Sequence, residues 1–344
     1  MTWWTRHSKQ PTRRCDLSVP HGRAAATAER THHDSVVPRD TVRRATESRR
    51  ARKRERLEIL LFVAPALVLM AVFVAWPVIS AVRMSFYSWR GFGPMDDFVG
   101  LRNFTRVITD DVFAGAVANN LTIVVLSLLV QLPLGLGIAL LLNRRIRARG
   151  LLRTIIFVPY VVAEVIAGVI WLQLLQPRTG VVDGLLGAVG VTPPEQGFLG
   201  TPSLTLWTIF VVLTWKYLGI AILLFLAGLQ SIPDELYEAA QLDGATWWQA
   251  QRRVAVPLLG PTIRVWCFLS MIGSIQLFDL VWVMTGGGPA NATTTMATYL
   301  INHGTQRGNY GIAGAASVVL FVIALTMALL YQVFVLRRDT RVDR

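Results

Sequence analysis

Charged residues, cysteines and metal-binding patterns are scarce in this sequence, and each scarcity excludes a class of protein. Only 16% of the 344 residues are charged, against about a quarter in an average soluble domain, so an ordinary water-soluble globule is excluded. The two cysteines, Cys15 and Cys267, lie in a polar segment and an apolar run, which gives no disulfide framework or redox pair. The five histidines form no His-Glu-x-x-His pattern, so no zinc site is expected.

Lysine is also rare, and its positions exclude one kind of ATP hydrolysis. The lysines are Lys9, Lys53 and Lys216, and none follows a glycine or precedes serine or threonine as a Walker A loop requires. The sequence also contains no paired-carboxylate, Ser-His or metal constellation. We therefore predict that the chain is not an enzyme and holds no catalytic residue, metal or cofactor of its own.

Long apolar runs are the dominant feature of the sequence, of which 53% is hydrophobic. A membrane-spanning helix needs about 20 predominantly apolar residues. Charges interrupt three of the runs, with Glu164 in the third, Lys216 in the fourth, and Arg264 and Asp279 in the fifth. The pattern predicts an all-α membrane protein with six transmembrane helices, over residues 59–82, 115–142, 151–175, 203–229, 258–284 and 311–336.

Lysine and arginine are distributed unevenly around these runs. With both termini in the cytoplasm, 26 of the 34 basic residues lie inside and six lie outside, while Lys216 and Arg264 lie within runs. An excess of basic residues marks the cytoplasmic side of membrane proteins. We therefore predict that both termini are cytoplasmic.

The first 56 residues differ in composition from the rest of the chain. They contain 15 basic and six acidic residues, and no apolar stretch long enough for a secretory signal. A segment of this composition cannot bury a core, so we expect a disordered cytoplasmic tail. A basic tail beside a membrane contacts anionic lipid, which we favour over nucleic-acid binding. The predicted domains are this tail (1–56), a six-span membrane domain (57–338) and a short C-terminal cytoplasmic tail (339–344).

The loop between the fourth and fifth runs, residues 231–257, has the local signals of two short helices. Pro233 suits a first helical position, and Gly244 suits a helix end. Thr246 and Gln249 are spaced as a capping box that starts a second helix, and Pro257 separates it from the next run. We call residues 231–257 the coupling loop and predict that it forms a compact knob on the cytoplasmic face.

The composition of the coupling loop indicates what it contacts. Ala239 and Ala240 permit close approach of a partner backbone, while Glu238 and Asp243 can accept charge-assisted hydrogen bonds. Four acidic residues against two arginines are a poor composition for anionic lipid. A protein partner is favoured, and an amphipathic loop on the membrane surface is the alternative.

These residues carry a resemblance to a known family. Glu238-Ala239-Ala240, Gly244, Val254 and Val256-Pro257 resemble the Glu-Ala-Ala signature of bacterial ABC importer permeases. The maltose-type, carbohydrate-importing branch of that family is similar at four further motifs: Phe-Val-Gly-Leu-Arg-Asn-Phe at 98–104, Val-Pro-Tyr at 158–160, Ala-Gly-Leu-Gln-Ser-Ile-Pro at 227–233 and Thr-Gly-Gly-Gly-Pro at 285–289.

The resemblance covers roughly residues 57–338 and implies a type I importer fold in the bacterial cell membrane. It implies that the coupling loop docks into a groove on an ATPase subunit, which binds ATP and magnesium. The implied partners are a second permease in a heterodimer, two ATPase subunits, an extracellular solute-binding protein and a sugar. The implied coupling residues are Glu238, Ala239, Ala240, Asp243, Gly244, Ala245 and Pro257; Gln251 departs from the family, which usually has phenylalanine there.

Polar residues inside the fourth and fifth runs are candidates for a substrate path, because each needs a partner or water. Aromatic faces suit the C–H surface of sugars, while amide, hydroxyl and carboxylate groups suit their hydroxyls. Two alternatives are that Lys216 only pairs with Asp279 and that Glu164 joins two subunits. The candidates are Trp215, Lys216, Tyr217, Gly219, Ser270, Ser274, Gln276, Phe278 and Asp279.

Other functions fit the sequence less well. An ion-coupled secondary transporter would use Glu164 or Asp279 as its coupling acid, but it leaves the acidic coupling loop without a role. A permease of the same family for glycerol phosphate or another polyol is the closer alternative. Phosphate favours several arginines in a path, and the fifth run has only Arg264, so a neutral sugar is preferred.

Overall fold

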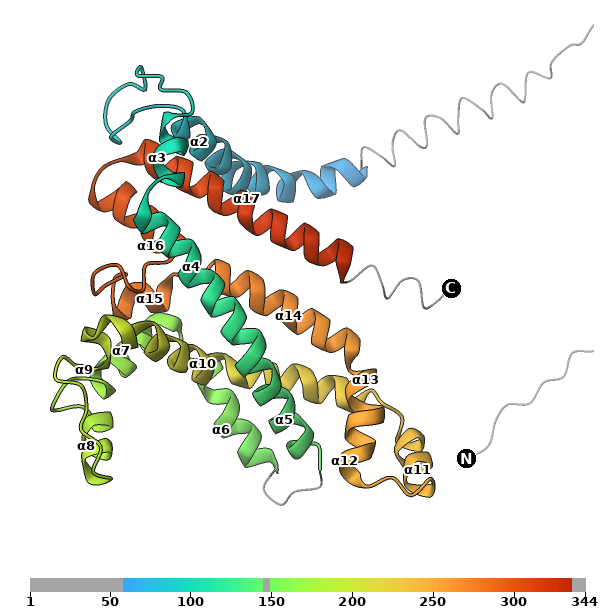
Figure 1. Cartoon of the computed structure of the whole chain (residues 1–344). Coiled ribbons are helices and arrows are strands. Elements are labelled where there is room, and N and C mark those ends of the chain that lie inside the picture. Colours follow the sequence, from blue (N-terminus) through green and yellow to red (C-terminus); the bar gives the residue numbers. More distant parts are fainter. Residues whose placement is uncertain (1–57, 145–148, 336–344) are drawn as a thin grey trace, which may run out of the picture. The chain divides into compact units, whose positions relative to one another are not determined.

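The computed structural model describes residues 58–144 and 149–335 (Figure 1). The predicted tails at 1–56 and 339–344, and Leu336 at the end of the sixth run, lie outside the described residues. The chain forms two structural units, one that ends at Leu67 and one that begins at Val68. Throughout the described ranges every regular element is a helix, apart from one isolated β-bridge between Tyr87 and Phe98. The all-α fold class is confirmed.

The helices follow one another along the chain with short connections. After the helical residues 58–70, the elements are η1 (Ala71–Ala75), α2 (Trp76–Ser85), α3 (Arg102–Ile108), α4 (Asp111–Leu126), η2 (Ser127–Gln131), α5 (Leu132–Leu142), α6 (Arg149–Val161), α7 (Glu164–Leu174), α8 (Val181–Ala188), α9 (Gly197–Gly200), α10 (Pro202–Gln230), α11 (Asp234–Leu242), α12 (Trp247–Ala250), η3 (Gln251–Ala255), α13 (Val256–Leu258), α14 (Gly260–Ile275), α15 (Asp279–Met284), α16 (Met296–Ile301), η4 (Asn302–Gln306) and α17 (Tyr310–Phe334), where η marks a π-helical turn.

Four of the six predicted spans are continuous helices, and the third and fifth fall on two bent helix pairs, Gly150–Val161 with Glu164–Leu174 and Trp247–Leu258 with Gly260–Ile275. The continuous ones are Glu58–Ser85, Asp111–Leu142, Pro202–Gln230 and Tyr310–Phe334. The third span was predicted as one helix, and this is wrong in detail: α6 and α7 are turned by 100° at residues 162–163. Pro159 within α6 lacks the N–H that would continue the helical ladder.

The fifth span also departs from a continuous helix. At its start, the helix Trp247–Leu258 of the coupling loop meets Gly260–Ile275 at a bend of 65°, where Pro261 occupies the start of α14. The helix then ends at Ile275, and a separate short helix, α15, begins at Asp279. The predicted span 258–284 therefore contains a non-helical segment at 276–278, which needs neighbouring groups to bond its backbone inside a membrane.

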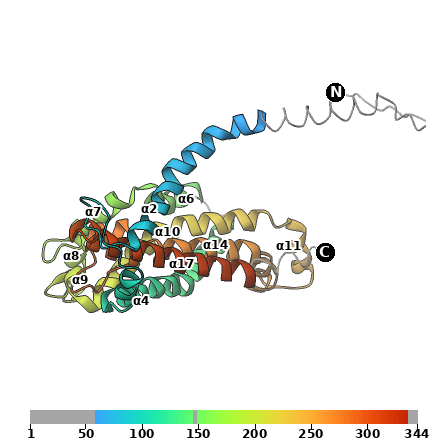
Figure 2. The same cartoon turned by 90° about the horizontal axis from the view of Figure 1, so that it is seen from above.

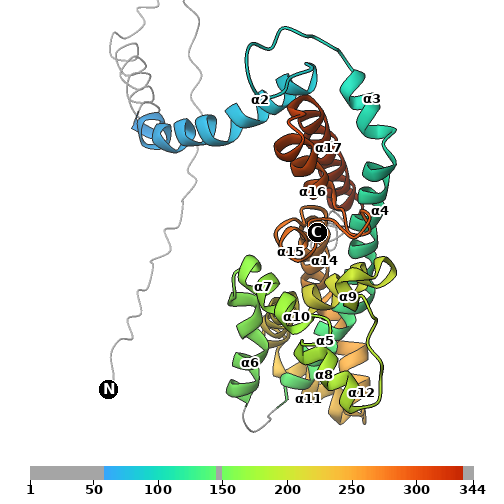
Figure 3. The ribbon, with the colours of Figure 1, turned by 90° about the vertical axis from the view of Figure 1, so that its left-hand side faces the viewer.

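Within the second unit, α10 is the helix around which several others pack. It contacts α5, α6 and α14, and α14 also contacts α17, so α10, α14 and α17 run alongside one another (Figure 2). α6 and α7 lie on one side of α10 (Figure 3). α2 packs along α17. These contacts place two broken spans, α6–α7 and α14–α15, around one continuous helix.

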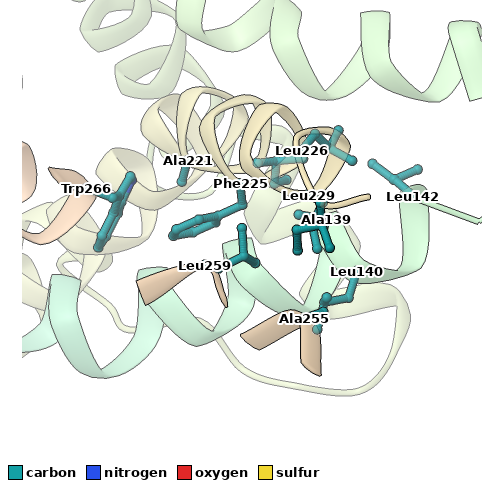
Figure 4. Close-up of a cluster of buried hydrophobic side chains, with 12 residues drawn as sticks. Ala139, Leu140, Leu142, Ala221, Phe225, Leu226, Leu229, Ala255, Leu259 and Trp266 are labelled. Atoms are coloured by element: carbon teal, nitrogen blue, oxygen red, sulfur yellow. The ribbon is translucent and has the colours of Figure 1, made fainter. Parts of the chain in front are cut away.

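A buried apolar cluster joins α10 to its neighbours. In Figure 4, Phe225 and Leu229 of α10 lie among side chains of α5 and of the segment from η3 to α14. Because lipid tails are as apolar as leucine, close van der Waals contact stabilises such an interface more than removal from water does. The buried members are Ala139, Leu140, Leu142, Ala221, Ile222, Phe225, Leu226, Leu229, Ile232, Ala255, Leu259 and Trp266.

Candidate functional site

A cavity of about 460 Å³ opens between the two broken spans and their continuous neighbours. We call it the central cavity. Its wall combines aromatic rings with hydroxyl, amide and carboxylate groups, the mixture that binds polar organic solutes. The lining residues are Ile123, Ser127, Gln131, Tyr160, Glu164, Leu213, Tyr217, Ile220, Leu224, Trp266, Leu269, Ser270, Gly273, Ser274, Gln276, Leu277, Phe278 and Asp279.

Six of the nine predicted path residues line the central cavity, namely Tyr217, Ser270, Ser274, Gln276, Phe278 and Asp279. Ser270 and Ser274 share one face of α14, as their spacing of four predicts. Phe278 lies beyond the end of that helix, at the cap of α15, and still reaches the cavity. Trp215, Lys216 and Gly219 do not line it, so Tyr217 is the candidate from α10 that reaches this cavity.

The Lys216 ammonium bonds the backbone at the break in the third span. The side chain is 3% exposed, and its Nζ donates to the Val162 carbonyl at 2.5 Å. A helix end leaves carbonyls without partners and carries a partial negative charge, and an ammonium satisfies both. The Lys216 side chain therefore hydrogen-bonds to the backbone at the kink after α6 and does not pair with Asp279.

Tyr217 connects the same break to the cavity wall. Its hydroxyl donates to Oε1 of Glu164, the first residue of α7. The Tyr160 ring packs edge-on against the Tyr217 ring, with centroids 6.3 Å apart. These contacts hold Glu164 at the wall, where its carboxylate is available to a solute.

Asn120 plays the corresponding part at the break in the fifth span. The side chain is fully buried, and its amide donates to the Ser274 carbonyl at 2.7 Å and the Ile275 carbonyl at 3.2 Å. Its Oδ1 accepts from the Met296 amide at 2.9 Å. A side chain of α4 thus hydrogen-bonds to the end of α14, as a side chain of α10 hydrogen-bonds to the backbone just after α6.

Sequence analysis missed Asn120, Ser127 and Gln131 because the second span carries no charge. A signal was present: two asparagines, a threonine, a serine and a glutamine interrupt this apolar run. Ser127 and Gln131 lie four residues apart in η2 and line the cavity. The Gln131 amide also donates to the Thr214 hydroxyl at 3.1 Å.

Trp215 and Gly219 serve packing around α10. The Trp215 ring packs edge-on against Trp171, with centroids 5.5 Å apart. A Cβ at Gly219 would lie 2.5 Å from the Ile156 carbonyl oxygen, so only glycine allows α6 to approach this closely. Gly219 also borders a second pocket of about 380 Å³ between α6 and α10, beside Arg153 and Thr154.

The coupling loop forms two short helices, as predicted. α11 begins at Asp234, with Pro233 as its cap, so Pro233 lies one position before the predicted one. α11 ends at Leu242, and Gly244 follows with φ +79°, a left-handed conformation that favours glycine. The Ala245 amide donates to the Ala240 carbonyl at 2.9 Å and closes the turn.

The second helix of the coupling loop begins with the predicted capping box. The Thr246 hydroxyl accepts from the Gln249 amide, and the Gln249 side chain accepts from the Thr246 amide. The Arg144 guanidinium lies 4.8 Å from the centre of the Trp247 ring and links the end of the second span to this helix. Gln251 is buried, and its Oε1 accepts no hydrogen bond from the described residues.

The outer surface of the coupling loop is exposed in the described part of the chain. No residue of α11 is buried, and Glu238 and Ala239 are exposed. Leu242 is 89% exposed and Trp248 is 66% exposed. Tyr237 is partly buried. Burial, and to a smaller extent the charge of the nearby Asp234, raises the pKa of its hydroxyl. Apolar side chains beside exposed acids form a surface suited to a protein partner.

Comparison with known proteins identifies the family. Residues 131–343 match the family described as the binding-protein-dependent transport system inner membrane component. The trehalose/maltose transport system permease protein of Thermococcus litoralis is 35% identical over 280 residues, which cover 81% of this chain and 94% of that relative. The sn-glycerol-3-phosphate transport system permease protein of Agrobacterium fabrum is 32% identical over 286 residues, 81% of this chain and 94% of the relative.

A solved structure is similar over most of the chain. A chain of the bacterial alginate ABC transporter, crystallised with its alginate pentasaccharide-bound periplasmic protein, matches with a TM-score of 0.71 and 28% identity, covering 81% of this chain and 94% of that one. The six-span helical arrangement is therefore the type I importer permease fold. This multi-pass membrane protein belongs to the family of inner membrane components of binding-protein-dependent transport systems.

Proposed function

We propose that this chain is a permease subunit of an ATP-driven, binding-protein-dependent sugar importer. The observation that carries the proposal is the central cavity, where four aromatic side chains lie with hydroxyl, amide and carboxylate groups in a member of a transport family. Sugars present both C–H faces and hydroxyls to such a wall. A membrane component of this kind is not itself an enzyme, so the energy comes from separate ATPase subunits that bind ATP and magnesium.

The coupling loop supports the proposed contact with an ATPase subunit. Its exposed helix α11 presents Glu238 and Ala239 outward, and the turn at Gly244 sets the angle between α11 and α12. Closure of an ATPase dimer would move two such loops together, one from each permease. The proposed coupling residues are Glu238, Ala239, Ala240, Asp243, Gly244, Ala245 and Pro257.

The full assembly that we propose contains a second permease, two ATPase subunits and an extracellular solute-binding protein. The permease domain would comprise residues 57–338, with both termini in the cytoplasm. The binding protein would deliver sugar to the outer mouth, and the permease pair would alternate between outward-facing and inward-facing states. Membrane lipid surrounds the spans, whose apolar side chains are largely exposed in the isolated chain.

Charge reversal in the coupling loop tests the proposal. Glu238→Lys removes a charge-assisted contact that contributes about 1.5–3 kcal/mol, so uptake should fall at least about tenfold. Gly244→Asp places a side chain at φ +79° and should act in the same way. The measurement is sugar uptake by membrane vesicles, together with co-purification of the ATPase.

The matched control is Glu195→Lys, which reverses another exposed acid in the connection between α8 and α9. This variant should transport like the wild type. Normal uptake and normal ATPase co-purification in both Glu238→Lys and Gly244→Asp would contradict the proposed function.

A further inference from the structure

The wall of the central cavity is negatively charged. Its lining includes the carboxylates of Glu164 and Asp279 and, among the described residues, no lysine, arginine or histidine. We infer that this chain's side of the cavity selects solutes by charge: it accepts a neutral or cationic saccharide, such as an amino sugar, and rejects uronates and sugar phosphates. The inference rests on the proposed function and adds a substrate class to it.

The two carboxylates come from the two broken spans. Glu164 is the first residue of α7, Asp279 is the first residue of α15, and these two helices pack against each other. The Tyr217 hydroxyl of α10 donates to Glu164, and all three residues line the central cavity. The breaks therefore bring two acids, distant in sequence, to one wall.

Asp279 is the carboxylate with the fewer partners. The Glu164 carboxylate accepts a hydrogen bond from the Tyr217 hydroxyl. The Asp279 side chain is exposed at the cavity and makes no hydrogen bond or ion pair within the described ranges. A solute therefore meets Asp279 as a carboxylate without a hydrogen-bond partner on this wall.

The Lys216 ammonium does not provide the cavity wall with a positively charged group. It is 3% exposed and bonded to the Val162 carbonyl, so a solute meets the carboxylates and not this group. An anionic solute would thus lose its hydration and find no positive partner, which is strongly unfavourable away from bulk water.

The rest of the wall suits a neutral or cationic solute. The rings of Tyr160, Tyr217, Trp266 and Phe278 provide aromatic surface, which packs on sugar C–H faces and attracts cations. Hydroxyls and amides from Ser270, Gln276 and Gln131 provide donors and acceptors. An ammonium group on the sugar would find both carboxylate and ring faces.

Thiol-reactive probes of opposite charge test the inference in the assembled transporter. In a Cys15→Ser, Cys267→Ala background, Ser270→Cys places one thiol on the wall. The probes are the cationic trimethylammonium-ethyl and the anionic sulfonato-ethyl methanethiosulfonates. The rate at which each probe reacts with the thiol is divided by its rate with free mercaptoethanol, and the cationic value is then divided by the anionic one to give a ratio. We expect the cationic probe to be favoured at least about tenfold. A Thr192→Cys control in the exposed connection between α8 and α9 should show a ratio near one.

Changes at Asp279 separate the electrostatic effect from access. Asp279→Asn should bring the ratio at Ser270→Cys towards one, and Asp279→Lys should invert it. A ratio of one or less without these changes, or a ratio that Asp279→Asn leaves unaltered, would overturn the inference. If Ser270→Cys fails to react, Gln276→Cys repeats the test on the same wall, and failure of both positions would overturn it as well.

Neutral-sugar uptake distinguishes this inference from the proposed function. Normal uptake with a ratio of one would refute charge selection and leave the importer intact. A tenfold ratio without any sugar uptake would retain the negative wall and refute the sugar proposal.

Discussion

At the scale of single residues, Lys216 is a charged side chain that is costly to bury in a membrane and that hydrogen-bonds to the backbone at a helix break. Lys216 is inside a membrane-spanning helix and almost fully buried, a position that usually marks a functional residue. Its ammonium bonds the Val162 carbonyl, which the break in the third span leaves without a helical partner. Its role as a substrate contact stays a prediction, and its position indicates that it supports the kink.

Lys216→Met tests that role. Methionine fills a similar volume but leaves the Val162 carbonyl buried without a donor, so stability should fall by roughly 1–3 kcal/mol. The measurement is the melting temperature of the purified, detergent-solubilised protein. Lys216→Gln keeps a donor and should lose less. A Lys216→Met protein as stable as the wild type would show that the bond contributes nothing.

Ser274 tests the cavity itself. Its side chain is 8% exposed and lines the central cavity. Ser274→Leu fills part of the space and removes a hydroxyl, and an unmade buried hydrogen bond costs about 1–3 kcal/mol, so apparent sugar affinity or turnover should fall roughly five- to a hundredfold. Uptake and ATPase binding are measured together.

The control for Ser274→Leu is Leu320→Met in α17, a change that conserves volume within an apolar cluster and should be silent. ATPase binding should persist in both variants. Normal transport by an assembled Ser274→Leu complex would move the substrate path away from this face of α14, towards Tyr217 and Glu164.

At the scale of elements, each broken span is bonded by a polar side chain from a continuous one. Lys216 of α10 bonds the break after α6, and Asn120 of α4 bonds the end of α14. Irregular backbone within a membrane persists only where neighbours or water satisfy it. The breaks turn Glu164 and Asp279 towards one cavity, so the polar side chains at the breaks determine the chemistry of its wall.

The segment from α16 to η4 contains a hydrogen-bond network around the buried side chain of His303. The Tyr299 hydroxyl donates to Asp110 at 2.6 Å, and His303 Nδ1 lies 3.2 Å from the Tyr299 carbonyl. Arg307 donates to His303 Nε2 at 3.0 Å, which requires a neutral imidazole that accepts there. Burial, with the adjacent guanidinium, lowers the pKa of His303 below its ordinary 6.5.

This shift predicts the sign of a stability change. Because the unfolded histidine binds a proton more readily than the folded one, the folded state is penalised as pH falls through about 6.5 and below. The melting temperature of the wild type should therefore decrease between pH 7.5 and 5.5, and that of His303→Gln should decrease less. Parallel curves for the two proteins would exclude His303 as the source of the change.

At the scale of the whole molecule, the distribution of basic residues predicts its orientation. With 26 of the 34 basic residues assigned to the inside and six to the outside, a phosphatase reporter fused after Gly190 should be active and one fused after Arg338 inactive. Enzyme activity in intact cells is the measurement, and a fusion after Asn302 repeats the test on the outer side. The opposite pattern would reverse the predicted topology.

Features set by neighbouring residues could be predicted from the sequence. The six spans follow from the length of the apolar runs, and the two helices of the coupling loop follow from Gly244 and the Thr246 capping box. Each depends on residues within one or two helical turns, so the local pattern is sufficient. Family membership followed for the same reason, since its motifs are short and continuous.

Only the tertiary structure decided which polar residues face the cavity and which ones bond the backbone where the spans break. Asn120 and Ser274 are 154 residues apart, and Lys216 and Val162 are 54 apart. Since no local pattern encodes such pairs, Lys216 was predicted to contact substrate and Asn120 was not considered. The sequence by itself determined six apolar spans and a loop of two short helices, while only the tertiary structure decided which long-range hydrogen bonds satisfy the backbone at the breaks, because that backbone has no water to bond inside a membrane.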